Sequence, residues 1–99
     1  MEEIQVNIGV EQEITIVYGD DELKIILLFN DYFNLWFINL SNKTTDLLKG
    51  VSMPLGVNVL FGQGLPYGEL KLIDTGGDLD LNMKADLGKR IKLVRNVEE

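Results

Sequence analysis

The residues best suited to chemistry gather in one loop, Asp74-Thr-Gly-Gly-Asp78-Leu-Asp80-Leu-Asn82. Asp78, Asp80 and Asn82 alternate along the chain as the oxygen ligands of a calcium loop do. The pattern departs from an EF-hand because leucines occupy the spacer positions and no glutamate follows Asn82 to close the cage. The competing interpretation is a solvated loop held by its own Asp and Asn side chains. We therefore expect no tightly bound calcium and no other cofactor.

Catalytic side chains are scarce in the rest of the chain. There is no histidine and no cysteine, which excludes Ser-His-Asp and Cys-His nucleophile systems and removes the commonest zinc ligands. A carboxylate pair such as Asp74 with Asp78 can in principle run hydrolysis, but any acidic loop offers such pairs. The sequence predicts a protein that is not an enzyme, with no catalytic residue and no metal ligand.

Adjacent aromatic residues give the clearest indication of an interface. Trp36 and Phe37 follow one another in an alternating segment, so their side chains face opposite sides of a strand. Only one of them can lie in a single-layer core, and the other must meet a second sheet, a loop or a partner. Ile26 and Leu28 interrupt the polar face of the preceding strand in the same way. These four residues are candidate interface residues; an ordinary core and an aromatic groove for a sugar or peptide are the alternatives.

Charge is distributed unevenly along the chain. The formal net charge is −7, and the segment ending at Asp31 contains eight acidic residues against one base, Lys24. Arg90 and Lys92 lie in a basic alternating segment near the other end, and they complete the set of candidate interface residues. An acidic side and a basic side would let copies of the chain stack or form a ring, whereas ordinary solvated strand faces are the alternative. The acidic total argues against nucleic-acid binding, which needs a basic surface.

Strands must position these residues, because the dominant hydrophobic period along the chain is two. The expected strands cover residues 4–8, 13–18, 23–29, 33–40, 46–52, 69–74 and 91–94, and residues 57–61 are a candidate for another short one. We predict an all-β fold, a small antiparallel barrel or sandwich of six or seven strands, with at most one short helical turn near residues 84–88. The length suits a single domain over residues 1–99.

Membrane and export signals do not stand out in the sequence. No stretch reaches the roughly 18 apolar residues that a membrane helix needs. The acidic start, Met1-Glu-Glu-Ile, lacks the basic residues that open a signal peptide. We expect synthesis in a cytoplasm and no membrane partner.

The order of motifs from Leu65 to Val94 carries a family resemblance. A Pro-Tyr-Gly turn leads into the alternating segment Glu69–Asp74, then an acidic Gly-Gly loop, Asp86-Leu-Gly, and the basic alternating segment that ends at Val94. The strand with Trp36 and the segment Met53-Pro-Leu-Gly56 extend the similarity upstream. In this order the chain resembles the small baseplate plug proteins of contractile-tailed bacteriophages, including the cyanophage type.

The resemblance implies a structural part of a virion or of a phage-like particle. Such a protein would plug or tie the hub region at the lower end of the tail tube, without catalysis. The implied partners are the hub, spike and tube proteins, together with other copies of the chain in a threefold or sixfold arrangement. The implied location is the tail baseplate, after synthesis in the host cytoplasm. The alternative function is a small β-sandwich binding module that uses Trp36 and the acidic loop for a carbohydrate, with or without calcium.

Overall fold

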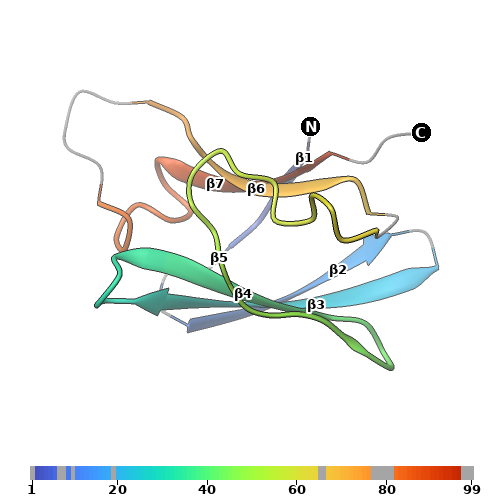
Figure 1. Ribbon diagram of the computed structural model, residues 1–99. Coiled ribbons are helices and arrows are strands. Elements are labelled where there is room, and N and C mark those ends of the chain that lie inside the picture. Colours follow the sequence, from blue (N-terminus) through green and yellow to red (C-terminus); the bar gives the residue numbers. More distant parts are fainter. Residues whose placement is uncertain are drawn as a thin grey trace.

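In the part of the chain that the structure describes, seven strands form two antiparallel sheets that lie face to face (Figure 1). The computed structural model describes residues 2–6, 9, 11–18, 20–64, 67–76 and 82–96. One sheet has the order β1-β7-β6 and the other has the order β2-β3-β4-β5. The strands are β1 (Glu2–Ile4), β2 (Glu11–Tyr18), β3 (Asp21–Asn30), β4 (Leu35–Ser41), β5 (Asp46–Ser52), β6 (Glu69–Asp74) and β7 (Ile91–Asn96). The all-β prediction is confirmed, and the architecture is the sandwich, since the described strands do not close into a barrel.

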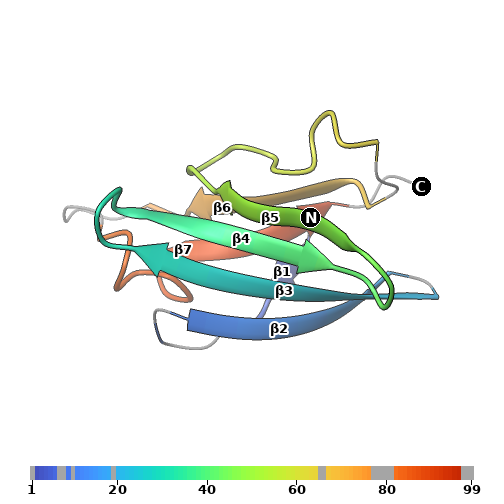
Figure 2. The same cartoon turned by 60° about the horizontal axis from the view of Figure 1, so that its bottom comes forward.

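The four-stranded sheet is a meander in which each strand pairs with the next along the chain (Figure 2). Asn30 organises the turn between β3 and β4, because its Oδ1 atom accepts hydrogen bonds from the backbone N–H groups of Tyr32 (2.9 Å) and Phe33 (3.1 Å). Asn34 closes this turn at a φ of 54°, which asparagine tolerates better than most residues. The prediction that the fourth strand begins at Phe33 was therefore wrong, and the strand begins at Leu35.

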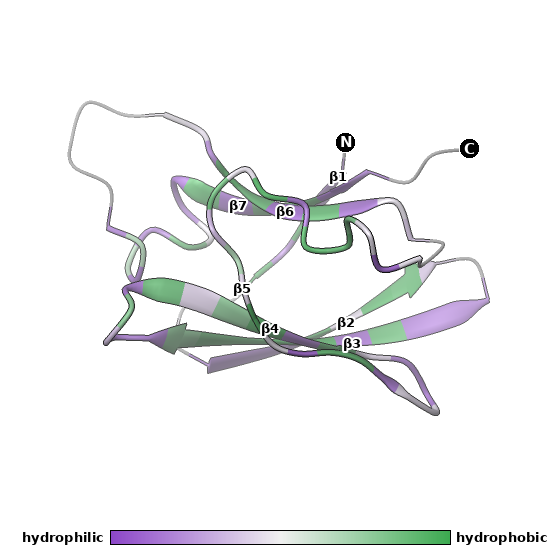
Figure 3. Cartoon of the chain, viewed as in Figure 1, coloured by the Kyte–Doolittle hydropathy of each residue, from purple (hydrophilic) through white to green (hydrophobic). Residues whose placement is uncertain are grey.

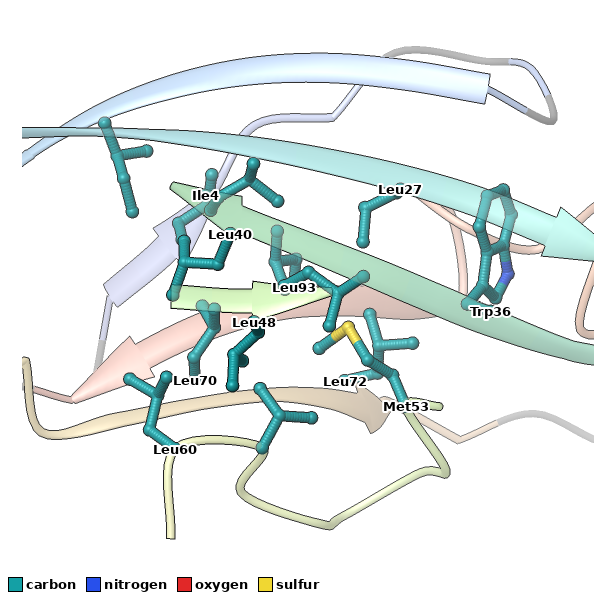
Figure 4. Close-up of a cluster of buried hydrophobic side chains, with 14 of the residues drawn as sticks. Ile4, Leu27, Trp36, Leu40, Leu48, Met53, Leu60, Leu70, Leu72 and Leu93 are labelled. Carbon is teal, nitrogen blue, oxygen red and sulfur yellow. The ribbon is translucent and has the colours of Figure 1, made fainter. Parts of the chain in front are cut away.

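The hydrophobic core fills the space between the two sheets, where side chains from both layers point toward one another (Figure 4). Every second residue of a strand faces the same side, so the apolar residues at alternate positions form this core. In β3 the inward residues are Leu23, Ile25 and Leu27, each at most 1% exposed. The core also contains Trp36, Ile38 and Leu40 of β4, Leu70 and Leu72 of β6, Ile91 and Leu93 of β7, and Met53.

The segment after β5 crosses from one sheet to the other. The backbone N–H of Met53 donates to Trp36 O (2.8 Å) in the four-stranded sheet, and that of Gly56 donates to Leu72 O (2.7 Å) in the three-stranded sheet. The expected short strand at residues 57–61 does not form there. Asn58 holds this segment as a turn, since its Oδ1 atom accepts from the N–H groups of Leu60 and Leu70, both at 3.0 Å.

Residues 82–90 return the chain to the sandwich through a series of turns. One helical-type hydrogen bond, from the N–H of Asp86 to Asn82 O (2.9 Å), occurs near the predicted helical turn, and the described residues contain no helix. Gly88 has a φ of +83°, and a Cβ at this position would lie 3.0 Å from a methyl carbon of Val6, so any other residue would be strained there. In the part of the chain that the structure describes, no helix is long and apolar enough to span a membrane.

The first strand is shorter than the alternation suggested. β1 ends at Ile4, whereas the sequence pattern extends to Ile8. Asn7 and Ile8 lie outside the described residues. β1 pairs with β7 at the edge of the three-stranded sheet, with Ile4 opposite Leu93. This pairing brings the acidic start of the chain alongside the basic strand near its end.

Candidate functional site

The outer face of the four-stranded sheet carries an apolar patch, which we define as Ile26, Leu28, Phe33, Leu35 and Phe37. Strand register brings its members together. Leu28 lies opposite Phe37, and Ile26, two residues earlier on the same face of β3, lies opposite Asn39. The strand residues of the patch are half-buried, whereas Phe33 is 60% exposed. Alternation forces this arrangement, since the other face of β3 and β4 already supplies the core.

Aromatic rings extend the patch along the turn between β3 and β4. The ring centroids of Phe33 and Phe37 lie 6.2 Å apart, and those of Tyr32 and Phe33 lie 4.9 Å apart in an edge-to-face arrangement. Tyr32 is 88% exposed. The colouring in Figure 3 shows the polar beginning of β3 giving way to hydrophobic residues toward this turn. The apolar character of the outer face is therefore concentrated at one end of the sheet.

Trp36 lies on the opposite side of the same strand. It is 0% exposed, its ring packs edge-to-face on Phe29 (5.3 Å between centroids), and its Nε1–H donates to Met83 O at 2.6 Å. The prediction that only one of Trp36 and Phe37 lies in the core is confirmed. Direct contact of Trp36 with a partner or a carbohydrate stays a prediction, although its side chain is fully buried in the isolated chain.

Acidic residues border the patch along β2. Glu11 lies opposite Leu28, and Glu13 lies opposite Ile26, so both carboxylates stand beside the patch on the outer face. Both residues are exposed. Lys24 forms an ion pair with Glu13 at 3.4 Å. We call Glu11 and Glu13 the acidic border.

The outer face of the three-stranded sheet has a different character, because opposite charges alternate across it. Lys92 pairs with Glu3 (3.7 Å between Nζ and Oε2), and Lys71 pairs with Glu69 (3.1 Å). Val94 lies on this face opposite Glu3 and Lys71, yet it is only 4% exposed. Long charged side chains can cover apolar surface in this way with their methylene groups. This face therefore satisfies its charges within the chain.

Arg90, the other basic interface candidate, also has a partner within the chain. Its guanidinium donates to both carboxylate oxygens of Asp74, with Nε–Oδ1 at 2.6 Å and Nη2–Oδ2 at 3.0 Å. The Asp74 carboxylate also accepts from the N–H of Gly76 (2.9 Å). Gly76 has a φ of +96°, as expected for a loop glycine, whereas Gly77 lies outside the described residues. Asp74 is thus committed to shaping the loop.

The hydrogen bonds from Arg90, and next that from Gly76, hold the pKa of Asp74 below its ordinary value of 3.8. A depressed pKa means that this carboxylate stabilises the fold above about pH 4 and loses that contribution as the pH falls toward the folded-state pKa. We expect Arg90→Gln to move the pKa of Asp74 back toward 3.8, as followed by carbon NMR of its carboxyl group. The difference in free energy of unfolding between Arg90→Gln and the natural protein should shrink as the pH falls below about 4. Equal pKa values in both would contradict this assignment.

The remaining acids of the predicted calcium loop, Asp78 and Asp80, lie outside the described residues. Among the residues that the structure does describe, no three His, Cys, Asp or Glu side chains are grouped to hold a metal ion. The prediction that no calcium binds tightly stays a prediction.

A family model described as "Cyanophage baseplate Pam3 plug gp18" matches residues 1–96. The chain belongs to this family of baseplate plug proteins. The match spans the acidic β2–β3 hairpin, the aromatic strand and the basic β7 strand alike. No curated protein matches the chain. Membership of the plug family supports a structural role in a phage tail baseplate, association with other baseplate components, and a role other than catalysis.

Sequence reasoning missed one further apolar surface of this plug-family chain. Phe61 is 83% exposed and Val57 is 48% exposed, and with Val51 and Val59 they line an open groove of about 480 Å³ beside β5. The alternation in residues 57–61 had suggested a strand, and in a strand Val57, Val59 and Phe61 would share one buried face. The signal that could have revealed the groove is the cluster of glycine and proline around this segment, which prevents a regular strand.

Proposed function

We propose that this plug-family protein is a structural subunit that plugs or ties the hub region of the baseplate at the lower end of the tail tube. The observation that carries the proposal is the contrast between the two outer faces. One face balances its charges within the chain, while the other leaves an apolar, aromatic patch in solvent. Contiguous exposed apolar surface on a small protein is typical of a protein–protein contact.

We place the docking surface on the apolar patch, with Phe37 as its centre. Leu28 lies opposite Phe37 in the sheet, and Phe33 packs near its ring. Aromatic residues are enriched at protein interfaces, and a few central residues supply most of the binding energy. Trp36 supports this surface from behind, because it anchors the same strand in the core.

We also propose that Arg90 and Lys92 contact a second neighbouring protein at the three-stranded sheet. Each already has an acidic partner within the chain, at 2.6 Å for Arg90 and 3.7 Å for Lys92. A charge that is already paired within its own chain gains little from a second partner unless the first pair is broken. We therefore assign the larger share of the docking energy to the apolar patch.

The proposed neighbours are the hub, spike and tube proteins and other copies of this chain. A plug on the tail axis must match the symmetry of the rings around it, so three or six copies are expected. The proposed role is mechanical and takes place in the virion, after synthesis in the host cytoplasm.

The test is a phage whose own copy of the gene is disrupted and which receives variants in trans. We expect Phe37→Ser to fold but to enter baseplates about 10–30-fold less well, as for the loss of a central interface residue. Val17→Ser is the matched control, because Val17 is also exposed (58%) but sits in β2 at the other end of the sheet.

Incorporation is measured by quantitative mass spectrometry of purified particles, and copy number by reconstruction of the baseplate. Normal incorporation of Phe37→Ser, or an equal loss for Val17→Ser, would contradict the proposed docking surface. A single copy placed off the tail axis would contradict the ring arrangement.

A further inference from the structure

The apolar patch and the acidic border form one continuous surface with a defined direction. Across the sheet, Glu11 of β2 is followed by Leu28 of β3, Phe37 of β4 and Ser52 of β5. The next row reads Glu13, Ile26 and Asn39. In these two rows negative charge lies on the β2 side of the patch, and the residues toward β5 are uncharged. Further along β5, Asp46 and Lys49 line a shallow pocket with Ile26 and bring one charge of each sign.

The acidic border is only partly neutralised within the chain. Glu13 has Lys24 at 3.4 Å, in a pair whose side chains are both more than half exposed. Glu11 forms no ion pair among the residues that the structure describes. Two carboxylates on one strand face repel each other, and that repulsion is relieved when a cation approaches from outside.

A second copy of the chain is poorly equipped to supply those cations. The chain has nine lysine and arginine residues. Six of them form ion pairs with acidic residues of the same chain: Lys24, Lys71, Lys84, Arg90, Lys92 and Arg95. Of the other three, Lys43 and Lys49 lie in the β4–β5 hairpin and Lys89 lies in the turn before β7. With a net charge of −7, two copies also repel each other at long range.

We infer that the apolar patch docks a different protein, whose contact surface has an apolar centre and lysine or arginine side chains along the edge that meets β2. The inference rests on the proposed docking role of the patch, and adds the chemistry and the orientation of the partner. Apolar contact supplies the attraction, while the acidic border admits only one orientation because the reverse orientation leaves its carboxylates without cations.

The first experiment identifies what lies on the patch in assembled particles. A photo-crosslinking phenylalanine derivative is placed at position 37, the particles are irradiated, and the crosslinked peptides are identified by mass spectrometry. We expect crosslinks to one segment of another baseplate protein with lysine or arginine residues nearby. Crosslinks to a second copy of this chain, or to a segment without basic residues, would overturn the inference.

The second experiment tests the charge. The double variant Glu11→Lys/Glu13→Lys should stay folded and enter baseplates about tenfold less well, since each cation-facing carboxylate is replaced by a repelling group. Its control is Asp20→Lys/Glu22→Lys, which makes the same change in net charge at the exposed far end of the sheet. Changing the basic residues of the partner's crosslinked segment to glutamate should restore incorporation of Glu11→Lys/Glu13→Lys into baseplates.

The two proposals fail in different ways. If Phe37→Ser assembles normally, the docking role of the patch is wrong. If Phe37→Ser is lost from particles but Glu11→Lys/Glu13→Lys assembles as well as its control, the patch docks a partner without the inferred basic edge, and only the further inference fails.

Discussion

Trp36→Ala is expected to lower the free energy of unfolding by about 3–5 kcal/mol, the range found for large aromatic residues removed from protein cores. Trp36 is fully buried, packs on Phe29, and donates its Nε1–H to Met83 O at 2.6 Å. The substitution leaves a cavity and an unpaired carbonyl, both of which cost stability. A chain of 99 residues has little stability to spare, so this loss is a large share of the total.

The measurement is urea unfolding followed by circular dichroism, because Trp36 is the chain's only tryptophan and fluorescence is lost with it. Phe37→Ala is the matched control: it removes an aromatic ring from the next position, on the outer face. We expect that control to cost about 1 kcal/mol or less, because Phe37 loses only cross-strand and ring contacts on the outer face. Similar losses for both variants would mean that Phe37 also belongs to the core of the isolated chain.

Arg95→Met is expected to cost about 2–3 kcal/mol, because it removes one charged hydrogen bond that joins the two sheets and two that tie β7 to β1. Arg95 belongs to β7, yet its Nη1 donates to Val17 O of β2 at 2.9 Å, and its guanidinium carbon lies 4.6 Å from the centre of the Tyr18 ring. Its Nη2 and Nε atoms also donate to Glu2 Oε1, at 2.7 and 3.2 Å. The hydrogen bond to Glu2 is the main cause that raises the pKa of Arg95, so the residue is charged throughout the usual pH range.

Thermal unfolding of Arg95→Met measures this contribution. Lys24→Met is the control, because it removes a cation whose ion pair is exposed and confined to one sheet. It should change stability by no more than about 1 kcal/mol. Arg95→Lys should rescue Arg95→Met only in part, since lysine keeps the charge but cannot donate in the forked geometry of arginine. Equal melting temperatures for Arg95→Met and the natural protein would show that the sandwich does not depend on this bridge.

The sequence predicted the strands well because alternation is a local property. Side chains two residues apart must share a face, so alternation alone separates Leu23, Ile25 and Leu27 of β3 from Lys24 and Ile26. The errors fell where side chains act on the backbone. Asn30 and Asn58 hold turns through their own oxygen atoms, and alternation carries no sign of such bonds.

The sequence also separated the two faces of β4 but did not decide which face is the core. Trp36 and Phe37 were both candidates, because alternation is unchanged when a strand is turned over. The second sheet settled the matter: Trp36 faces it and Phe37 faces solvent. The aromatic row at Phe33 and the acidic border beside it became visible only when strand register placed three strands next to one another.

By itself, the sequence determined the all-β class, the absence of histidine and cysteine chemistry, and the motif order that resembles the plug family, which the family match over residues 1–96 confirms. Only the tertiary structure decided where the basic residues find partners. Arg90 meets Asp74 sixteen residues away, and Arg95 meets Glu2 across almost the whole chain. Such pairs depend on which strands become neighbours, and that is fixed by packing of the two sheets rather than by local periodicity.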